Sequence, residues 1–506
     1  MTRSIVLLVL IFAYSVSFGQ KTWSSDVAQI VYDNCSSCHN PSGIGPFSLM
    51  QYADASLRAN AIKTSITNKS MPPWIADNDY QEYAHARVLT EAEIATITEW
   101  VDNGSPEGDA SKTPPPPVYK TRGFIEQKPD LELKIPKYKS KATTISDDYV
   151  CFSLPSNLAS NKKIRAFEVV PGNHSIVHHV LVYLDPTGNY ATDTAAGVCT
   201  GPTKGLIGGY VPGSPPTIFP TNGTDFNLGF EIESGSNVVL AMHYPEGSFG
   251  ELDSTLIRFW FYDDDVTMRE LESSSLIENW QFALPANQET KVEADQVITG
   301  GDLSILTVFP HMHLLGKTIE SYAVTPSDDT IPFVNIPHWD FEWQEFLFFK
   351  RAKKLPSGST IYGKGVYDNT TNNHHNPNKP PKNVFPGLNT SDEMFLIYFH
   401  YLPYVAGDEN RDIEALGTLA IANMFEADQA KVYPNPAQDR VMFDFGVDGS
   451  TTINLRIYDV LGQKVGEVVS DSDEIVWQIP LGLTSGIYHY SANIEGSFVN
   501  GSFVVR

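Results

Sequence analysis

Apolar residues recur at helical spacing in three short stretches between residues 21 and 110. In "SSDVAQIVYDNC", Val27, Ile30 and Val31 fall on one face of a helix, and a Ser-Asp pair before them is a helix-start signal. "DASLRANAIKTSI" and "TEAEIATITEWVDNG" repeat the pattern, and the latter begins with a capping box and ends at a glycine. The pattern predicts a small all-α unit of three short helices over residues 21–110.

The hydrophobic pattern changes after a run of prolines in "SKTPPPPVYK", which cannot continue a helix and predicts a linker over residues 111–124. Beyond it, β-branched and aromatic runs such as "IVHHVLVYL" and "TLIRFWFY" stand between turn residues, as strands do. Their extent suits two β-sandwich (jelly-roll-like) domains, which we place at residues 125–285 and 286–422. The sequence pattern changes again in residues 425–506, and it predicts a third, smaller β-sandwich there. The predicted fold class is therefore multidomain, with one all-α and three β parts.

The net charge of the 506-residue chain is −25, which argues against nucleic acid as a partner, because phosphate binding needs a basic surface. Residues 1–20 contain Arg3, the short apolar run Ile5–Ala13 and a small-residue cleavage region, which together predict a secretory signal peptide. The alternative is a membrane anchor, but the apolar run is short for a span. No later stretch of the sequence is long and apolar enough to cross a bilayer, so we expect an exported, soluble mature protein.

Cys35, Cys38 and His39 form a Cys-x-x-Cys-His motif in "NCSSCHNPSGIGPF". A Cys-x-x-Cys alone could be a zinc half-site or a redox dithiol, but the adjacent histidine can reach a haem iron, and no second cysteine pair completes a zinc site. We therefore predict one covalently bound haem c with His39 as an axial ligand. Met71, in "KSMPPWIAD", is the predicted second axial ligand, because the prolines hold its loop extended and a methionine ligand raises the reduction potential. His85 is its rival, and a core role for Met71 is the alternative.

The segment from "CSSCHNPSGIGPFSL" through "MPPW" to "LTEAEIATITEWVDNGSPEGD" resembles the cytochrome c-like module found fused to bacterial copper monooxygenases. The resemblance implies that the N-terminal part of the chain carries electrons. If Cys35 and Cys38 hold the haem, Cys151 and Cys199 remain, and in an exported protein a disulfide between them is the simple account. Two free buried thiols are the alternative.

Five histidines occur in three motifs of the β region. His178 and His179, in "HSIVHHVLVY", are strand neighbours that point to opposite faces, so they can share a metal ion only at a bulge or a strand end. His243, in "VVLAMHYPEG", is by itself typical of a packed, hydrogen-bonded strand residue. His311 and His313, in "FPHMHLLGK", are two residues apart on one strand face, so both imidazoles can bind one ion.

In their order and context these motifs resemble the type II copper, ascorbate-dependent monooxygenases, the family of peptidylglycine α-hydroxylating monooxygenase and dopamine β-monooxygenase. The later "NTSDEMFLIYFHY" matches the family's methionine-ligand segment, and the resemblance extends over about residues 125–410. It implies two copper ions and hydroxylation of a C–H bond of a small organic or peptide-like substrate, with O2 and an external electron donor. It further implies an electron-storing copper bound by His178, His179 and His243, and a catalytic copper bound by the catalytic residues His311, His313 and Met394.

The chain departs from this family in its cysteines and in its extra histidines. The animal enzymes carry several disulfides, whereas here Cys151 and Cys199 occur at places that match one family pair. Substrate-contacting residues do not carry over, so the substrate is not inherited from the animal enzymes. We interpret the two histidines of the Asn-rich "VYDNTTNNHHNPNKPP" as surface residues, and an extra metal contact is the alternative. The histidines without a counterpart in the family are His174, His338, His374, His375 and His400.

The C-terminal segments "VYPNPAQDRV", "IYDVLGQKV" and "LTSGIYHYSANIEG" resemble the type A sorting domain of the type IX secretion system of Bacteroidetes, over residues 430–506. The alternative is a carbohydrate-binding or structural sandwich. The resemblance implies an interaction with the type IX secretion machinery and a secreted or cell-surface location.

Together the motifs predict a secreted copper-dependent monooxygenase, an oxidoreductase that incorporates one oxygen atom, with electrons supplied through the covalent haem. The alternative is a surface electron-transfer or copper-binding protein without hydroxylase activity, although Met394 favours the enzyme. A copper oxidase or denitrification-type reductase is disfavoured, because the β domains offer no cysteine ligand for a blue-copper centre.

Overall fold

The computed structural model of the chain describes most of residues 20–506. The residues left out are 42–44, 118–124, 126, 145, 196–198, 200, 203, 342, 417–430, 446–451, 460–463, 473, 481 and 495–496. The predicted signal peptide, apart from its last residue, and the second half of the predicted linker lie outside the described residues. Within the described part, no helix is long and apolar enough to cross a membrane.

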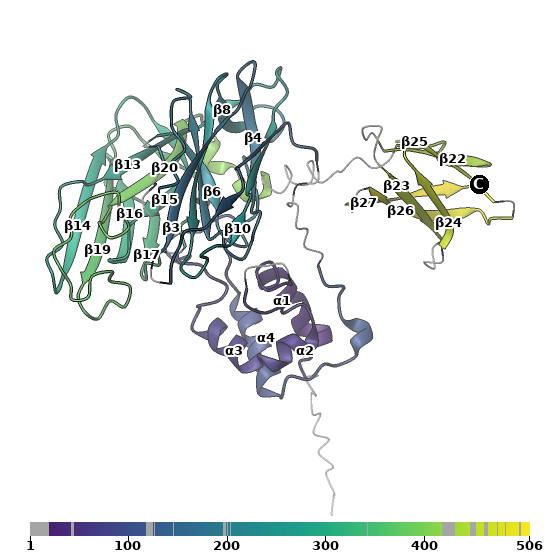
Figure 1. Cartoon of the computed structure of the whole chain (residues 1–506), viewed down its shortest axis with the longest axis horizontal. Coiled ribbons are helices and arrows are strands. Elements are labelled where there is room, and N and C mark those ends of the chain that lie inside the picture. The colour runs from purple at the N-terminus through teal and green to yellow at the C-terminus, as the bar shows by residue number, and fades with distance from the viewer. Residues whose placement is uncertain are drawn as a thin grey trace, which may run out of the picture.

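Residues 20–112 form a helical unit with a core of its own, below the β-sheets in Figure 1. The capping box predicted from Thr90 and Glu93 is confirmed at the start of its last helix, which ends before Gly104. The second predicted helix is divided in two at Arg58, whose backbone leaves the helical region. The helices are η1 (Trp23–Val27), α1 (Ala28–Asn34), α2 (Tyr52–Leu57), α3 (Ala59–Thr67), α4 (Glu91–Asp102) and η2 (Ala110–Lys112).

The first β-sandwich has two main sheets that enclose one apolar core. Its larger sheet has the order β1 (Leu131–Lys134), β11 (Leu256–Phe261), β4 (Lys162–Val170), β8 (Leu228–Ile232) and β12 (Arg269–Glu270), with β7 (Thr217–Ile218) beside β4. The other sheet has the order β3 (Asp148–Pro155), β9 (Asn237–Tyr244), β5 (His179–Asp185) and β6 (Leu206–Tyr210). A short pair, β2 (Tyr138–Lys139) and β10 (Leu252–Asp253), lies beside them.

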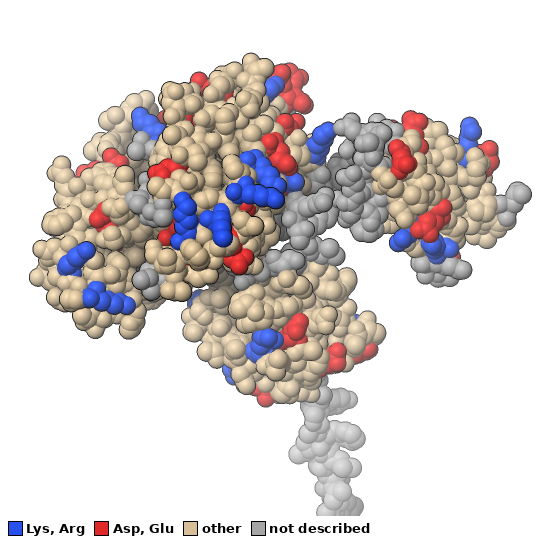
Figure 2. Space-filling view, in the orientation of Figure 1, with Lys and Arg blue, Asp and Glu red and all other residues tan. Residues whose placement is uncertain are grey.

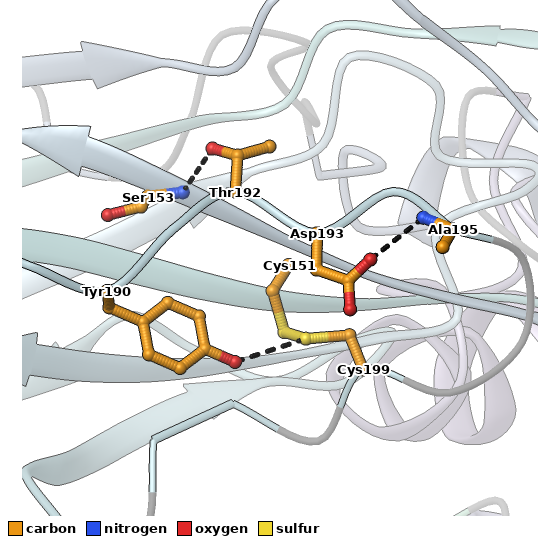
Figure 3. The surroundings of a disulfide bond; sticks show 7 residues. All are labelled: Cys151, Ser153, Tyr190, Thr192, Asp193, Ala195 and Cys199. Carbon is orange, nitrogen blue, oxygen red and sulfur yellow. Dashed lines mark hydrogen bonds between the residues drawn. A yellow bond between two sulfur atoms is a disulfide. The ribbon is translucent and has the colours of Figure 1, made fainter.

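A disulfide joins β3 of this sandwich to the segment that precedes β6, as Figure 3 shows. Cys151 and Cys199 are bonded, so the predicted disulfide is confirmed and the alternative of two free thiols is wrong. The Tyr190 hydroxyl lies 3.3 Å from Cys199 Sγ, as Figure 3 shows. The backbone of Asp193 forms a β-bridge with that of Cys151. The bond therefore holds the connection between β5 and β6 against the sheet that carries His179 and His243.

The second β-sandwich is built from two four-stranded sheets around a separate core. One sheet has the order β13 (Glu272–Glu278), β20 (Leu396–Pro403), β15 (Leu303–His311) and β18 (Leu347–Leu355). The other has the order β14 (Gln288–Val297), β19 (Thr360–Asn369), β16 (Gly316–Val324) and β17 (Thr330–Ile336), and η3 (Asp408–Asn410) follows β20. Strand β13 belongs to this sandwich although it precedes residue 286, because it pairs with β20 along its length.

A third β unit has its own core and lies to the right in Figure 1. Its sheets have the orders β21 (Lys431–Tyr433), β22 (Arg440–Asp444), β25 (Glu474–Gln478) and β24 (Lys464–Ser470), β23 (Ile453–Tyr458), β26 (Gly486–Ile494), β27 (Ser497–Val505). Acidic and basic side chains are interspersed over the face of the molecule drawn in Figure 2. The prediction of several β-sandwich parts is thus confirmed.

A strap, residues 74–87, connects α3 to α4 and packs on the second sandwich. Tyr83 forms a β-bridge with Phe349, and the Ala84 N–H donates to Phe348 O at 2.8 Å. Tyr83 is buried in the core of that sandwich, and Trp74 packs against the same core. The helical unit is therefore fastened to the β body through its own chain.

Candidate metal centres

Strand pairing brings together His178, His179 and His243. His179 is the first residue of β5, and the antiparallel register of β5 and β9 places it directly opposite His243. His178 lies just before the strand, and its N–H donates to His243 O at 3.0 Å. The pair thus occupies a strand end, where adjacent side chains are not forced onto opposite faces.

The ring nitrogens of this tri-histidine site have the spacing of ligands around one ion. His179 Nδ1 lies 3.4 Å from His178 Nδ1 and 3.2 Å from His243 Nδ1. Two nitrogens bound to one ion at about 2.0 Å, with a tetrahedral or trigonal angle, are about 3.3–3.5 Å apart. One ligand atom from each residue lies within 4.8 Å of the others. Among the described residues, this is the single such group of three or more His, Cys, Asp or Glu side chains.

The surroundings keep His178 and His179 neutral and hold the His243 ring in place. Burial and the neighbouring His243 lower the pKa of His178 to about 4, and burial lowers that of His179 still more clearly. The Asp147 carboxylate lies 3.3 Å from His243 Nε2, and the Tyr149 ring stacks on His243 at 4.4 Å. A carboxylate on the far nitrogen orients a metal-binding imidazole and raises its basicity.

His311 and His313 form a second pair, at the end of β15. His311 is the last residue of the strand, so His313 lies beyond it rather than on the same strand face, yet the two rings are 5.1 Å apart. His311 Nδ1 lies 2.7 Å from Gln344 Oε1, and His313 Nδ1 lies 3.1 Å from Asp392 O. Both acceptors require a protonated Nδ1, so both Nε2 lone pairs remain available to an ion.

Burial lowers the pKa of His311 to about 3 and that of His313 to about 4, so both imidazoles are neutral at physiological pH. Met394 is 5% exposed. It directly follows Asp392 and Glu393, which both accept hydrogen bonds from His313. The Glu393 carboxylate accepts the N–H groups of His313 and Leu315 at 2.8 and 2.5 Å. Burial raises the pKa of Glu393 to about 8. The segment that carries Met394 is thereby fixed beside His313.

One loop, described at residues 337–341 and 343–344, contacts both histidine sets and was not found from the sequence. The Trp343 ring lies 6.5 Å from that of His178, and the Phe341 ring lies 5.8 Å from that of His313. Trp339 Nε1 donates to His313 O at 3.1 Å. The aromatic run "HWDFEWQEF" between two strand patterns was the available signal.

This aromatic loop lines a cleft of about 1860 Å³ between the two sandwiches and the helical unit. Tyr149 and His243 line it from the first sandwich, and Met71 lines it from the helical unit. His374 and His375 also line the cleft, and both are exposed, as predicted. His400 is buried under the ring of Phe346 and does not line this cleft.

The Cys-x-x-Cys-His segment has two free thiols and an oriented histidine. Burial raises the pKa of Cys35 to about 12 and raises that of Cys38, which argues against a reactive redox dithiol. His39 Nδ1 lies 3.0 Å from Phe47 O, so Nε2 remains available to an iron. Met71 is 44% exposed, so the alternative of a core Met71 is wrong. His85 turns to the β body, with Nδ1 3.8 Å from Glu414 Oε1.

Two parts of the chain match known families. Residues 259–411 match the family "Copper type II ascorbate-dependent monooxygenase, C-terminal domain", and residues 431–506 match "Secretion system C-terminal sorting domain". The chain thus contains the second domain of a copper monooxygenase and a C-terminal sorting domain, which supports export by type IX secretion to a secreted or cell-surface location. No curated protein matches the chain.

Similarity to solved structures is weak. Faecalibacterium prausnitzii β-glucuronidase is 13% identical, with a TM-score of 0.13, over 44% of this chain and 38% of that one. A biofilm-associated protein BSP domain is 9% identical, with a TM-score of 0.15, over 77% of this chain and 84% of that one. The infectious bursal disease virus VP2 subviral particle is 9% identical, with a TM-score of 0.16, over 59% of this chain and 77% of that one. The chain thus spans well under half of the first of these, and such scores carry no functional argument.

Proposed function

We propose that this protein is a secreted copper-dependent monooxygenase that hydroxylates a C–H bond of an organic substrate with O2. His178, His179 and His243 bind the electron-storing copper in this proposal. His311, His313 and Met394 bind the catalytic copper. The single observation that carries the proposal is the convergence of imidazoles in two sets that contact one aromatic loop on a cleft, within a chain whose residues 259–411 match the copper monooxygenase family.

The donor atoms suit copper. Imidazole nitrogen accepts both copper oxidation states, and a thioether favours Cu(I). Hydrogen bonds from both Nδ1 atoms of His311 and His313 leave the Nε2 atoms for binding, and the low pKa values of these rings mean that no proton competes at neutral pH. Bound copper supplies O2 activation and single-electron storage.

The protein's own groups have separate tasks in this reaction, in which the C–H compound, dioxygen, two electrons and two protons give an alcohol and water. Gln344 and Asp392 hold the His311 and His313 rings in one tautomer. Trp339, Phe341 and Trp343 give the cleft an apolar wall against which the substrate's hydrocarbon part can pack.

We further propose that one covalent haem c, bound by Cys35 and Cys38 with His39 and Met71 as axial ligands, supplies electrons to the copper sites. The free thiols, the acceptor on His39 Nδ1 and the exposure of Met71 on the cleft support this arrangement. A haem that is linked to its protein at two thioethers and at the iron suits a one-electron carrier.

Metal content tests the proposal. The exported chain, matured with haem and reconstituted with copper, should contain about one iron and about two copper ions, with a c-type haem spectrum. His179→Ala and His313→Ala should each lose about one copper ion, whereas His374→Ala, a matched change of an exposed histidine in the same cleft, should keep both. Full copper in all three variants would refute the ligand assignment.

The alternative function is electron transfer or copper binding without hydroxylation. The variant Met394→Ile distinguishes this alternative from a hydroxylase. A hydroxylase with this change should lose O2 consumption while its haem is still reduced by an external donor. An unchanged rate of O2 consumption would refute the role of Met394.

A further inference from the structure

Cys38 of the helical unit lies against the first β-sandwich. Its Sγ is 3.8 Å from Pro212 O, in the turn that follows β6. Gly213, the next residue, has φ 79°, and a Cβ atom there would come within 2.5 Å of Cys38 Sγ. Only glycine, which has no Cβ atom, lets the backbone of this turn lie so close to Cys38 Sγ.

The strap gives the helical unit a second attachment to the β body. The Arg87 guanidinium pairs with both Glu345 carboxylate oxygens, and Nη1 and Oε2 are 2.9 Å apart. This ion pair is mostly buried, and Arg87 also lies over the Trp74 ring at 5.4 Å. Such a two-point attachment fixes the orientation of the Cys-x-x-Cys-His segment instead of leaving it on a flexible tether.

The turn that touches Cys38 is connected directly to the tri-histidine site. It follows Tyr210, the last residue of β6, and Tyr210 is paired with Val180 in the ladder between β6 and β5. His179 is the neighbour of Val180 at the start of β5. A path made of one close contact, a short stretch of backbone and one strand pairing thus leads from Cys38 to His179.

We propose that the turn Val211–Ser214 is the electron-transfer contact between the Cys-x-x-Cys-His segment and the tri-histidine site. This inference depends on the proposed function, since it needs haem at Cys38 and copper at His179. The turn passes one electron from a ferrous c-type haem to a cupric ion, and no covalent bond forms or breaks and no proton moves. Electrons then enter the protein's copper chemistry at His179 rather than at His311.

Two glycines of the first sandwich give a matched test. Gly213 and Gly223 have φ values of 79° and 73°, so alanine strains the backbone equally at both. A Cβ atom on Gly213 meets Cys38 Sγ, whereas one on Gly223 has nothing within 4 Å. Gly213→Ala should therefore displace Cys38 from the turn, and Gly223→Ala should not. Glu345→Ala, which removes the partner of Arg87, should loosen the helical unit independently.

The assay follows the haem itself rather than product formation. A photo-excited flavin reduces the haem of the full, haem- and copper-loaded chain in a pulse without O2, and the haem α-band reports its reoxidation by cupric copper. The unchanged chain and Gly223→Ala should show a first-order phase whose rate is independent of protein concentration. Gly213→Ala and Glu345→Ala should lose that phase while keeping their haem spectrum, haem potential and copper content.

Each outcome decides a different question. A fast phase retained in Gly213→Ala would overturn the contact and leave the proposed function intact. A chain without haem, or with no copper-dependent phase in any form, would overturn the proposed electron supply through the haem and the contact with it, whereas the copper sites stand or fall by the metal-content test. Loss of the phase in Gly213→Ala alone, with Glu345→Ala unaffected, would support the turn and refute the role of the strap.

Discussion

Gln344 offers the sharpest test of how the second histidine pair is prepared for an ion. Its Oε1 accepts the Nδ1 proton of His311 at 2.7 Å, and its Nε2 donates to Phe341 O at 2.6 Å. The side chain is 4% exposed, so water does not replace it. Gln344→Leu keeps the bulk of the side chain and removes both hydrogen bonds.

The magnitude follows from what the substitution leaves behind. A buried donor without a partner costs about 1–3 kcal/mol, and His311 Nδ1 would become such a donor. Loss of an acceptor behind a metal-binding histidine lowers metal affinity by about 10- to 100-fold, or about 1.4–2.7 kcal/mol. We therefore expect Gln344→Leu to weaken one copper site by about 10- to 100-fold and to leave the tri-histidine site unchanged.

The assay is a competitive Cu(I) titration with a chromophoric chelator, which resolves the two sites by affinity. Gln344→Glu keeps the acceptor for His311 and should keep most of the affinity, whereas Gln296→Leu, an exposed change on β14, should have no effect. Wild-type affinity in Gln344→Leu, or an equal loss at both copper sites, would refute the reasoning.

Three further outcomes are expected. Replacing Cys151 and Cys199 by serine opens a loop with a sequence separation of 48, and should lower the free energy of unfolding by about 4 kcal/mol in chemical denaturation. Burial lowers the pKa of His400 to about 3, so the unfolded chain gains a proton below pH 6.5 that the folded chain excludes. From pH 6.5 down to 3, His400 by itself should remove about 1.4 kcal/mol of stability per pH unit from the copper-free protein, in addition to the effect of the other buried histidines. His400→Gln, which keeps a donor to Leu206 O, should therefore show a shallower slope in denaturation at pH 4.5 and 7.5. Deleting residues 431–506 should leave the protein in the periplasm, as fractionation of cells would show.

Local patterns in the sequence predicted the elements well. The helical spacing, the Thr90–Glu93 capping box and the alternating strands depend on neighbours a few residues apart, and the structure contains each of them. The cysteine pair followed from counting, because only Cys151 and Cys199 remained once the Cys-x-x-Cys-His motif was set aside. The division of the second helix at Arg58 was missed, since no proline or glycine marks it.

The sequence by itself determined which side chains can bind metal and which segments are helix or strand, because those properties depend on residue type and short-range spacing. Only the tertiary structure decided that His179 stands opposite His243, because strand register sets contacts across a separation of 64 residues. The same holds for Gln344 behind His311 and for Gly213 against Cys38, which meet through the packing of segments far apart in the chain. Long-range contacts of this kind come from burial of the sandwich cores and the strap, and no local pattern encodes them.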